Sequence, residues 1–363
     1  MRVIISAGGT GGHIYPALAI VNKIKELEPN SEFIYIGTTD RMESKIVPKT
    51  GIKYEAIEMK GINRRNIFKN FKTLSCFLKA INKSKKIMKE FKPEIVLGIG
   101  GYITAPVIYA AHSLKIKTFI HEQNSIPGLS NKLLNRYADK IGVSLEGSLK
   151  YFNKDKVLFT GNPRSEEAIN IEASLKSDYG LSSNKKLVLI TMGSLGSLTM
   201  NKKFKEMLPN FDKKPYEVLF VTGKEYYEDF KDLKIANNVK VVEYLNNSIG
   251  IMKKADLIVS RAGASYISEM TALGLPAILI PSPYVTNNHQ EKNAEELGEA
   301  KAAIIIKEKE LTEELLFEKI DYILNNNNTY DIMKKNMKKL AVTNSATKIY
   351  NIIKKMLEEG QHG

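Results

Sequence analysis

The residues of this chain best suited to chemistry form a glycine-rich loop that ends in a histidine. Gly8-Gly9-Thr10-Gly11-Gly12-His13 follows the strand-like run Arg2–Ala7 and precedes the helix-like run Tyr15–Leu27. Glycines let a ligand approach the backbone, and amides at the start of a helix favour an anion such as a diphosphate. A tight turn without a ligand is the alternative, although one or two glycines would suffice for it. The histidine adds a titratable group, so the loop predicts a nucleotide-sugar site.

The loop departs from the two commonest phosphate-binding motifs. It lacks the Lys-Ser/Thr ending of a Walker loop, and a G-x-G-x-x-G frame begun at Gly9 places Ile14 where the third glycine belongs. A nicotinamide dehydrogenase would share the alternating strand and helix pattern and could use Asp40 as its ribose carboxylate. The missing glycine argues against that class, and so do two further phosphate-type loops later in the chain.

Those two loops also follow strand-like runs. Met192-Gly193-Ser194-Leu195-Gly196-Ser197 comes after Leu187–Thr191, and Arg261-Ala262-Gly263-Ala264-Ser265 opens a helix that carries Glu269. Small residues at the start of a helix suit a phosphate, and a carboxylate near them can accept two hydrogen bonds from ribose hydroxyls. A carboxylate near the positive end of a helix dipole is the alternative explanation for Glu269.

Two polar segments follow apolar strands. His121-Glu122-Gln123-Asn124 places four polar side chains where packing does not require them, and three of these can serve sugar hydroxyls. Asn124 also fits a simple turn. The segment 280–290 leaves its strand through prolines and ends in His289 and Gln290, which can hydrogen-bond a sugar or belong to a capped loop.

Short β-branched runs alternate with longer amphipathic runs, as in parallel doubly wound sheets. The expected strands form two series: Val3–Ser6, Phe33–Ile36, Ile95–Gly98, Thr118–His121, Lys140–Val143 and Val157–Phe159, then Leu187–Thr191, Tyr216–Val221, Val239–Glu243, Leu257–Ser260, Ala277–Ile280 and Ala303–Ile306. The turn-rich stretch 160–164 separates the series. The tail from Ile332 to Glu359 is expected to be helical, and the polar run Asn325–Asn328 is expected to be a loop.

Composition supports a globular α/β protein of two domains. At 363 residues the chain is long for a single core. It has no uninterrupted apolar run of about 18 residues, and its first residues enter a strand, so neither a transmembrane helix nor a signal peptide is expected. The single cysteine, Cys76, excludes an internal disulfide framework and fits a reducing compartment.

The net charge of +14 is concentrated in the first half. Residues 1–160 hold 26 Lys/Arg and 13 Asp/Glu, whereas residues 161–363 hold 28 and 27. The stretch from Lys60 to Lys92 has eleven basic residues against Glu90 alone. Such asymmetry indicates an anionic partner, either nucleic acid or an anionic membrane surface. No nucleic-acid-binding motif accompanies the stretch, and nucleic acid would leave the glycine loops without a role, so the membrane is favoured.

Together these motifs resemble the MurG family, the peptidoglycan N-acetylglucosaminyltransferases that convert lipid I to lipid II. The resemblance covers essentially the full length and rests on 8–13, Gly37-Thr38-Thr39-Asp40-Arg41-Met42-Glu43, Gly98-Ile99-Gly100-Gly101-Tyr102, 121–124, Gly161-Asn162-Pro163-Arg164, 261–264 with Glu269, and 287–290. The second glycine loop departs from the family pattern at Met192, Leu195 and Ser197.

The resemblance implies the GT-B fold: two doubly wound, Rossmann-like domains at 1–160 and 161–340 with a cleft between them, and a helix at 341–363 that packs back on the first domain. It implies that UDP-N-acetylglucosamine binds mainly to the second domain and lipid I to the first, with no cofactor and no metal. The implied substrate-binding residues are Thr10, Gly11 and Gly12 for the acceptor diphosphate, Ser194, Ala264 and Ser265 for the donor diphosphate, Ile249 for uracil, Glu269 for ribose, and Asn124, Arg164, His289 and Gln290.

The transfer inverts the sugar linkage and needs a base for the acceptor hydroxyl. His13 is the leading candidate because histidine titrates near neutral pH, and His121 is the reserve. An anchor for the glycine loop is the alternative role for His13. The lipid-linked acceptor implies a peripheral enzyme at the cytoplasmic face of the cell membrane, attached through Lys60–Lys92. Another GT-B enzyme that uses a UDP-sugar, such as a lipid glycosyltransferase or an epimerase, is the alternative function.

Overall fold

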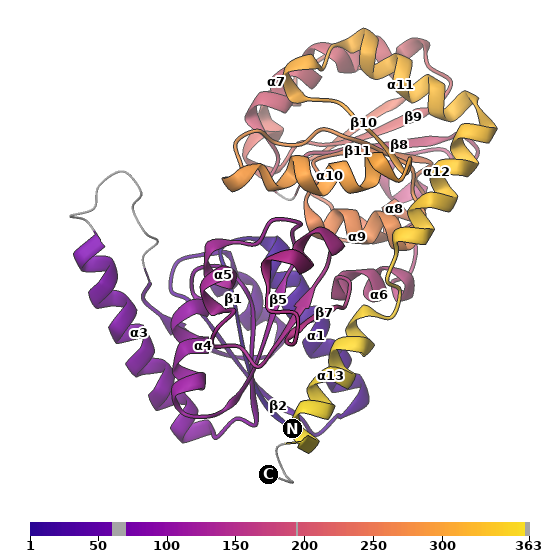
Figure 1. Cartoon of the computed structure of the whole chain (residues 1–363). Helices are drawn as coiled ribbons and strands as arrows, with labels where there is room; N and C mark the ends of the chain where they lie inside the picture. The colour runs from indigo at the N-terminus through magenta and orange to yellow at the C-terminus, as the bar shows by residue number, and fades with distance from the viewer. Residues whose placement is uncertain (60–69, 194, 360–363) are drawn as a thin grey trace. The chain divides into compact units, whose positions relative to one another are not determined.

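The computed structural model describes residues 1–59, 70–193 and 195–359. The chain forms two compact units, and the second is inserted between two parts of the first (Figure 1). Met1–Arg164 and Asn344–Gly363 make the N-terminal domain, and Ser165–Thr343 make the C-terminal domain. Each domain has its own parallel sheet, so the expected α/β class with two Rossmann-like domains is confirmed.

Within the described residues, the N-terminal sheet has seven strands in the order β3-β2-β1-β4-β5-β6-β7. Their bounds are β1 Arg2–Ala7, β2 Glu32–Thr38, β3 Lys53–Ile57, β4 Ile95–Gly100, β5 Lys117–Glu122, β6 Lys140–Val143 and β7 Val157–Phe159. The strand order reverses between β1 and β4, and ligands of doubly wound folds bind beyond the carboxyl ends of the strands at this switch point. The glycine loop follows β1, and Gly101-Tyr102 follows β4.

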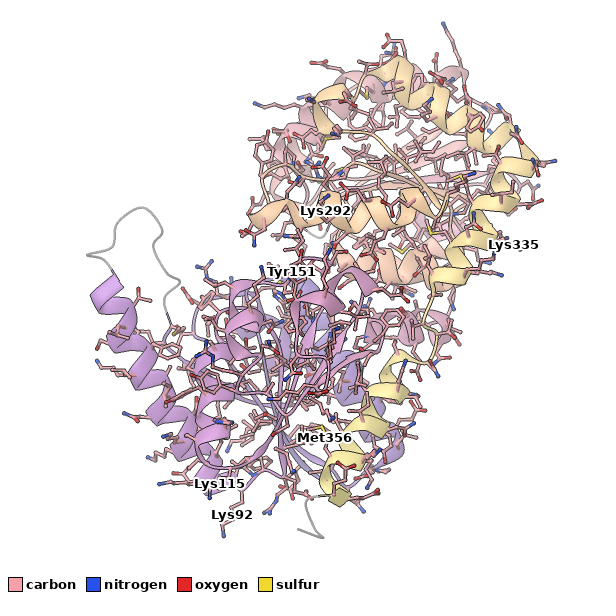
Figure 2. All side chains as sticks on the ribbon, viewed as in Figure 1. Lys92, Lys115, Tyr151, Lys292, Lys335 and Met356 are labelled. Atoms are coloured by element: carbon pink, nitrogen blue, oxygen red, sulfur yellow. The ribbon has the colours of Figure 1, made fainter. Side chains whose placement is uncertain are left out.

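Helices cover both faces of this sheet. Their bounds are α1 Gly11–Leu27, α2 Met42–Ile46, α3 Asn70–Phe91, α4 Thr104–Ser113, α5 Leu129–Leu134 and α13 Ser345–Glu359. One core contains Ile14 and Ile20 of α1 with Ile349 and Ile353 of α13, and the other packs α3 and α4 on the opposite side of the strands. Met356 of α13 belongs to the first core (Figure 2). The C-terminal helix therefore completes the N-terminal domain.

The C-terminal domain repeats this plan. Its strands are β8 Leu187–Thr191, β9 Glu217–Val221, β10 Val239–Val242, β11 Leu257–Ser260, β12 Ala277–Leu279 and β13 Ala303–Ile305, in the order β10-β9-β8-β11-β12-β13. The helices are α6 Pro163–Asn170, α7 Leu198–Met207, α8 Ser248–Met252, α9 Ala264–Leu273, α10 His289–Glu299, α11 Glu313–Asn325 and α12 Asn327–Leu340. The switch point lies between β8 and β11, and each of these strands leads into one of the remaining small-residue loops.

The structure corrects four details of the expected elements. β3 was not expected, because Lys53 and Glu55 interrupt the continuous apolar run that marks the buried strands of this sheet. Helix α1 begins at Gly11 rather than Tyr15. The run Asn325–Asn328 is not a loop, since Asn326 alone separates α11 from α12 and its side chain accepts a hydrogen bond from the Thr329 amide. The tail is two helices, interrupted between Leu340 and Ser345.

Two lysines lie at the amino-terminal edge of the N-terminal sheet. Lys92 and Lys115 close α3 and α4 in the left-handed region, with φ of 52° and 57°, just before β4 and β5. Figure 2 shows both side chains at this amino-terminal edge of the sheet.

Across the ranges 1–59, 70–193 and 195–359, no helix is both long and apolar enough to span a bilayer.

Candidate active site

The glycine loop is tied to the neighbouring strand at the N-terminal switch point. The Gly8 amide donates to the Gly100 carbonyl at 3.1 Å. Gly9 has a φ of +89°, a conformation that L side chains rarely adopt. Thr10 is the N-cap of α1, and Gly11 and Gly12 lie in its first turn. The first amides of a 17-residue helix therefore lie at the carboxyl edge of the sheet, which suits an anion.

The ring of His13 is held in one orientation. Its Nδ1 lies 3.1 Å from the Gly8 carbonyl oxygen and 3.3 Å from Thr10 Oγ1. A carbonyl can only accept, so the neutral ring carries its proton on Nδ1 and its lone pair on Nε2. A Cβ on Gly100 would lie 2.4 Å from the ring carbon Cδ2, so the ring packs on the bare backbone of that glycine. This tautomer is the one that a base acting through Nε2 requires.

A buried carboxylate beneath the loop was not predicted as a functional residue. Glu43 of α2 is 0% exposed. Its Oε1 accepts from the Thr38 amide at 3.2 Å and from the Thr38 hydroxyl at 2.7 Å, and its Oε2 accepts from the Gly9 amide at 2.9 Å. Glu43 lies in one of the family motifs, but an acid beside Asp40 and Arg41 gives no sign of burial in the sequence.

Tyr35 and Tyr54 lie near this carboxylate. Burial raises the pKa of both phenols, and the charge of Glu43 raises it further. Both tyrosines are therefore neutral at physiological pH. The Tyr54 hydroxyl donates to the Thr38 carbonyl at 2.5 Å, beside the backbone amide that donates to Glu43.

His121, the reserve base, has a structural environment. It is 0% exposed, and its Nε2–H donates to the Gly161 carbonyl at 3.0 Å. Its Nδ1 accepts from Gln123 Nε2 at 3.1 Å. Burial lowers the pKa of His121 to about 4, although the bond to Gly161 opposes that shift. With both nitrogens engaged inside the domain, the geometry argues against contact with a substrate.

Glu122 organises the segment that carries Asn124. The Asn124 amide and its side-chain Nδ2 both donate to Glu122 Oε1, at 3.0 and 3.2 Å. Glu122 Oε2 accepts from the Gly128 amide and from Asn131 Nδ2. The carboxylate is 2% exposed, so it acts as an internal anchor. The orientation of the Asn124 amide is therefore fixed before any ligand binds.

Arg164 lies beside the first turns of α1. Its backbone amide donates to Asn162 Oδ1 at 3.1 Å, and its Cζ lies 5.4 Å from the centroid of the Tyr15 ring. This cation–π contact holds the guanidinium near the residues that follow His13.

In the C-terminal domain, α9 begins directly beyond β11. Gly263 is its N-cap, and Ala264 and Ser265 form the first turn. Glu269 lies further along the same helix and is 2% exposed. The arrangement places helix amides and a buried carboxylate on one element, as the ribose and diphosphate prediction requires.

Arg261 connects the loops around this helix, a role that was not predicted. Its Nη2 donates to Glu308 Oε2 at 2.5 Å and to Ser197 Oγ at 3.1 Å, and its Nη1 donates to the Ile280 carbonyl at 3.0 Å. Ser197 ends the second glycine loop, and Ile280 begins the segment that leads to Gln290. One buried guanidinium thus joins the exits of β8, β11 and β12.

The other predicted donor residues lie on the same domain. Ile249 is buried in α8, which Asn247 caps by accepting from the Gly250 amide at 2.8 Å. His289 opens α10 and donates from Nδ1 to the Thr286 carbonyl at 2.8 Å, and Gln290 Oε1 accepts from the Ser282 amide at 2.9 Å. Ser194 lies outside the described residues. The ligand contacts expected of these residues, and the cleft expected between the domains, stay predictions.

The glycosyltransferase family 28 N-terminal domain matches residues 3–143, and the family's C-terminal domain matches residues 187–354. A crystal structure of Acinetobacter baumannii MurG superposes with a TM-score of 0.77 at 26% identity, covering 98% of this chain and 99% of that one. A UDP-GlcNAc 2-epimerase from Neisseria meningitidis, bound to UDP-GlcNAc, is 16% identical with a TM-score of 0.68, covers 98% of this chain and 100% of that one, and shares the fold alone.

A relative from Bacillus pumilus is 46% identical over 361 residues, which cover 98% of this chain and 99% of the relative. It is named UDP-N-acetylglucosamine–N-acetylmuramyl-(pentapeptide) pyrophosphoryl-undecaprenol N-acetylglucosamine transferase. The similarity spans both domains, so the resemblance to the MurG family is confirmed. The chain therefore belongs to this family of N-acetylglucosamine transferases, and it is a glycosyltransferase.

Proposed function

We propose that this enzyme transfers N-acetylglucosamine from UDP-N-acetylglucosamine to the N-acetylmuramoyl-pentapeptide of undecaprenyl-diphosphate-linked lipid I, giving lipid II. The observation that carries the catalytic part of this proposal is the orientation of His13. A neutral imidazole with its Nδ1–H on the Gly8 carbonyl presents a basic Nε2 beside the amides of a diphosphate-type loop.

The reaction is a single displacement. The 4-hydroxyl oxygen of N-acetylmuramic acid attacks C1 of the donor sugar, and its proton passes to His13 Nε2. The bond from C1 to the β-phosphate oxygen breaks, its electron pair leaves with UDP, and the anomeric configuration inverts. A well-placed general base contributes roughly 10²–10⁴-fold to the rate.

The C-terminal domain supplies the donor site. The first amides of α9 stabilise the charge that develops on the diphosphate, with Ala264 and Ser265 in that turn. Glu269 accepts from the ribose hydroxyls, Ile249 lies against uracil, and Gln290 and His289 address the sugar. Arg261 holds the loops around this site in register.

The acceptor loop belongs to the N-terminal domain. Thr10, Gly11 and Gly12 direct their amides to the acceptor diphosphate, and Asn124 and Arg164 contact the sugars. Glu122 fixes the Asn124 amide through two hydrogen bonds, so this contact needs little rearrangement.

The acceptor is lipid-linked, so we also propose peripheral attachment to an anionic membrane surface. Part of the basic segment, residues 60–69, lies outside the described residues. In α3, Ala80, Ile81, Ile87 and Met88 pack into the core, whereas Leu74 and Leu78 are 56% and 54% exposed. An ordinary core-facing stripe does not explain this outward apolar pair among exposed lysines. Each cation near an anionic bilayer contributes about 1 kcal/mol.

A transfer assay with radiolabelled UDP-N-acetylglucosamine and a soluble lipid I analogue tests the activity. Label should appear in the disaccharide product with a β linkage. Epimerised UDP-sugar, or transfer to diacylglycerol but not to the lipid I analogue, would assign the enzyme to one of the alternative functions.

Vesicle co-sedimentation tests the membrane proposal. Binding should rise with anionic lipid content, fall with salt, and be lost when Lys79, Lys83, Lys86 and Lys89 are changed to Glu. A matched variant reverses the charge of four exposed lysines in the C-terminal domain, Lys202, Lys205, Lys335 and Lys339. Equal loss in both variants, or equal binding to neutral vesicles, contradicts the proposal.

A further inference from the structure

Glu43 and His13 contact opposite ends of the same peptide group. The bond between Gly8 and Gly9 carries the carbonyl that accepts from His13 Nδ1 at 3.1 Å. It also carries the amide that donates to Glu43 Oε2 at 2.9 Å. The peptide unit therefore bridges the buried carboxylate to the ring of the proposed base.

Close packing around the Gly8–Gly9 peptide depends on glycines. A Cβ on Gly8 would lie 2.5 Å from Glu43 Oε1, and a Cβ on Gly101 would lie 2.4 Å from the Gly8 carbonyl oxygen. The His13 ring rests on Gly100 in the same way. Gly8, Gly100 and Gly101 have no side chains, so the carboxylate, the peptide and the imidazole can approach one another closely.

We infer that Glu43 is a positioning residue that supports His13 as a base through the Gly8–Gly9 peptide. This inference rests on the proposed function of His13. When Nε2 takes the hydroxyl proton, the ring becomes an imidazolium whose Nδ1–H still donates to the Gly8 carbonyl. The carboxylate on the far side of the peptide stabilises that positive charge, much as a carboxylate bonded directly to histidine does in hydrolase triads.

Two effects act in the same direction. An N–H that donates to a carboxylate polarises its peptide group, so the carbonyl becomes a stronger acceptor. The unit charge of Glu43 also attracts the imidazolium through a site of low effective dielectric constant. Glu43 is wholly buried and Thr38 holds its other oxygen, so solvent screens this charge only weakly.

Other titratable side chains lie on the elements packed around the loop: Asp40 and Arg41 before α2, Tyr35 and Tyr54 on β2 and β3, Tyr102 after β4, Tyr15 on α1, and Arg164 at the start of α6. Asp40 and Arg41 carry opposite charges, and burial together with the charge of Glu43 raises the pKa of Tyr35 and Tyr54. A hydrogen bond joins Glu43, by contrast, directly to the loop.

The test follows the His13 imidazole by nitrogen NMR in the full-length enzyme without substrates. His13→Gln identifies its signals among those of the five histidines. In the wild type, the neutral ring should carry its proton on Nδ1. In Glu43→Gln the titration midpoint should fall by roughly one pH unit, as expected when one nearby opposite charge is removed.

Thr38→Val is the matched control, because it removes the hydroxyl bond to Oε1 but leaves the link from Gly9 to Oε2. It should leave the midpoint within about 0.3 unit. His112 on α4 reports whether the domain stays folded. An unchanged His13 midpoint in a folded Glu43→Gln overturns the inference. If that variant does not fold, the wild-type tautomer decides, since a proton on Nε2 would exclude the link through Gly8.

The pH dependence of turnover distinguishes a role of Glu43 in supporting the base from a purely structural role. In Glu43→Gln the acidic limb of kcat should move to lower pH, with the plateau about three- to tenfold lower because the base is weaker. If Glu43 has only a structural role, the variant should raise the KM for the acceptor without moving the acidic limb. That result would contradict the inference. Full turnover in His13→Asn would instead refute the proposed base, while the NMR result on the link would still stand.

Discussion

Arg261 and Glu308 form an ion pair of 2.5 Å in which both side chains are almost completely buried. The pair joins the exit of β11 to the segment after β13, and the same guanidinium reaches Ser197 and the Ile280 carbonyl. Three loops of the proposed donor site therefore depend on a single cation.

Glu308→Ala should destabilise the C-terminal domain by about 3–5 kcal/mol, because it leaves a buried guanidinium without its counter-ion. The KM for the UDP-sugar should rise, since the guanidinium that donates to Ser197 loses the carboxylate that fixes it. Urea unfolding followed by circular dichroism measures the first effect. The double variant Arg261→Met, Glu308→Leu should be more stable than either single variant. If the two losses of unfolding free energy instead add up in the double variant, the two residues act independently.

Glu269→Ala should raise the KM for UDP-N-acetylglucosamine, because a hydrogen bond to a charged acceptor contributes about 1.5–3 kcal/mol. The decisive comparison uses a donor built on deoxyribose-UDP. It should bind more weakly than the natural donor to the wild type but about equally well to the variant. If the deoxy donor loses the same affinity in both proteins, Glu269 does not contact the ribose.

His13→Ala should lower kcat by roughly 10²-fold or more while UDP affinity changes little, because the base acts in the transition state. His13→Asn should not restore the rate, since an amide cannot take the proton. Single-turnover kinetics and UDP titration measure the two quantities. Retention of more than about a tenth of the turnover in either variant excludes a general-base role.

Gly100→Ala should act on the same step from the neighbouring strand. Its Cβ would lie 2.4 Å from His13 Cδ2 at a residue whose φ is +114°, so the ring must move. We expect turnover to fall at least tenfold with UDP binding intact, because misplacing a catalytic group has costs of this size. Gly128→Ala is the control, since nothing lies within 4 Å of its added Cβ. Similar losses in the two variants would contradict the steric argument.

His121 should make the enzyme sensitive to acid. Its folded-state pKa of about 4 is below the ordinary value of 6.5, so protons bind the unfolded chain first. The stability that His121 provides is complete above about pH 6.5 and falls by about 1.4 kcal/mol per pH unit down to about pH 4. In His121→Gln this loss should be absent, so the stability gap between the two proteins should narrow over that range. A constant gap in urea unfolding would contradict the assignment.

The sequence predicted most strands because those of a buried parallel sheet are continuous apolar runs, such as Leu187–Thr191. It also predicted where the loops lie, since glycine-rich segments must follow strands at the switch points. β3 escaped detection because Lys53 and Glu55 interrupt its apolar pattern at the sheet edge.

The buried polar residues of the site could not be found in this way. Glu43, Glu122 and Arg261 lie in motifs that the sequence marks, but nothing in the sequence shows that their charges are buried, and only tertiary contacts remove them from water. His121 illustrates the opposite case, because its place after a strand suggested a substrate contact and its partners are internal. Residue types and their spacing predict which segments form the site, but they do not show which polar side chains are buried.

The return of α13 to the first domain has a consequence for biosynthesis. A ribosome completes the strands of the N-terminal sheet early, yet Ile349, Ile353 and Met356 fill part of the core beneath them. Vectorial folding usually lets the first domain finish first. Here the inserted C-terminal domain can fold while the N-terminal domain still exposes the apolar residues of α1 that α13 will cover. The N-terminal domain is therefore the last to complete its core. A released chain that is truncated after Asn344 should therefore remain a chaperone substrate even when its C-terminal domain has folded.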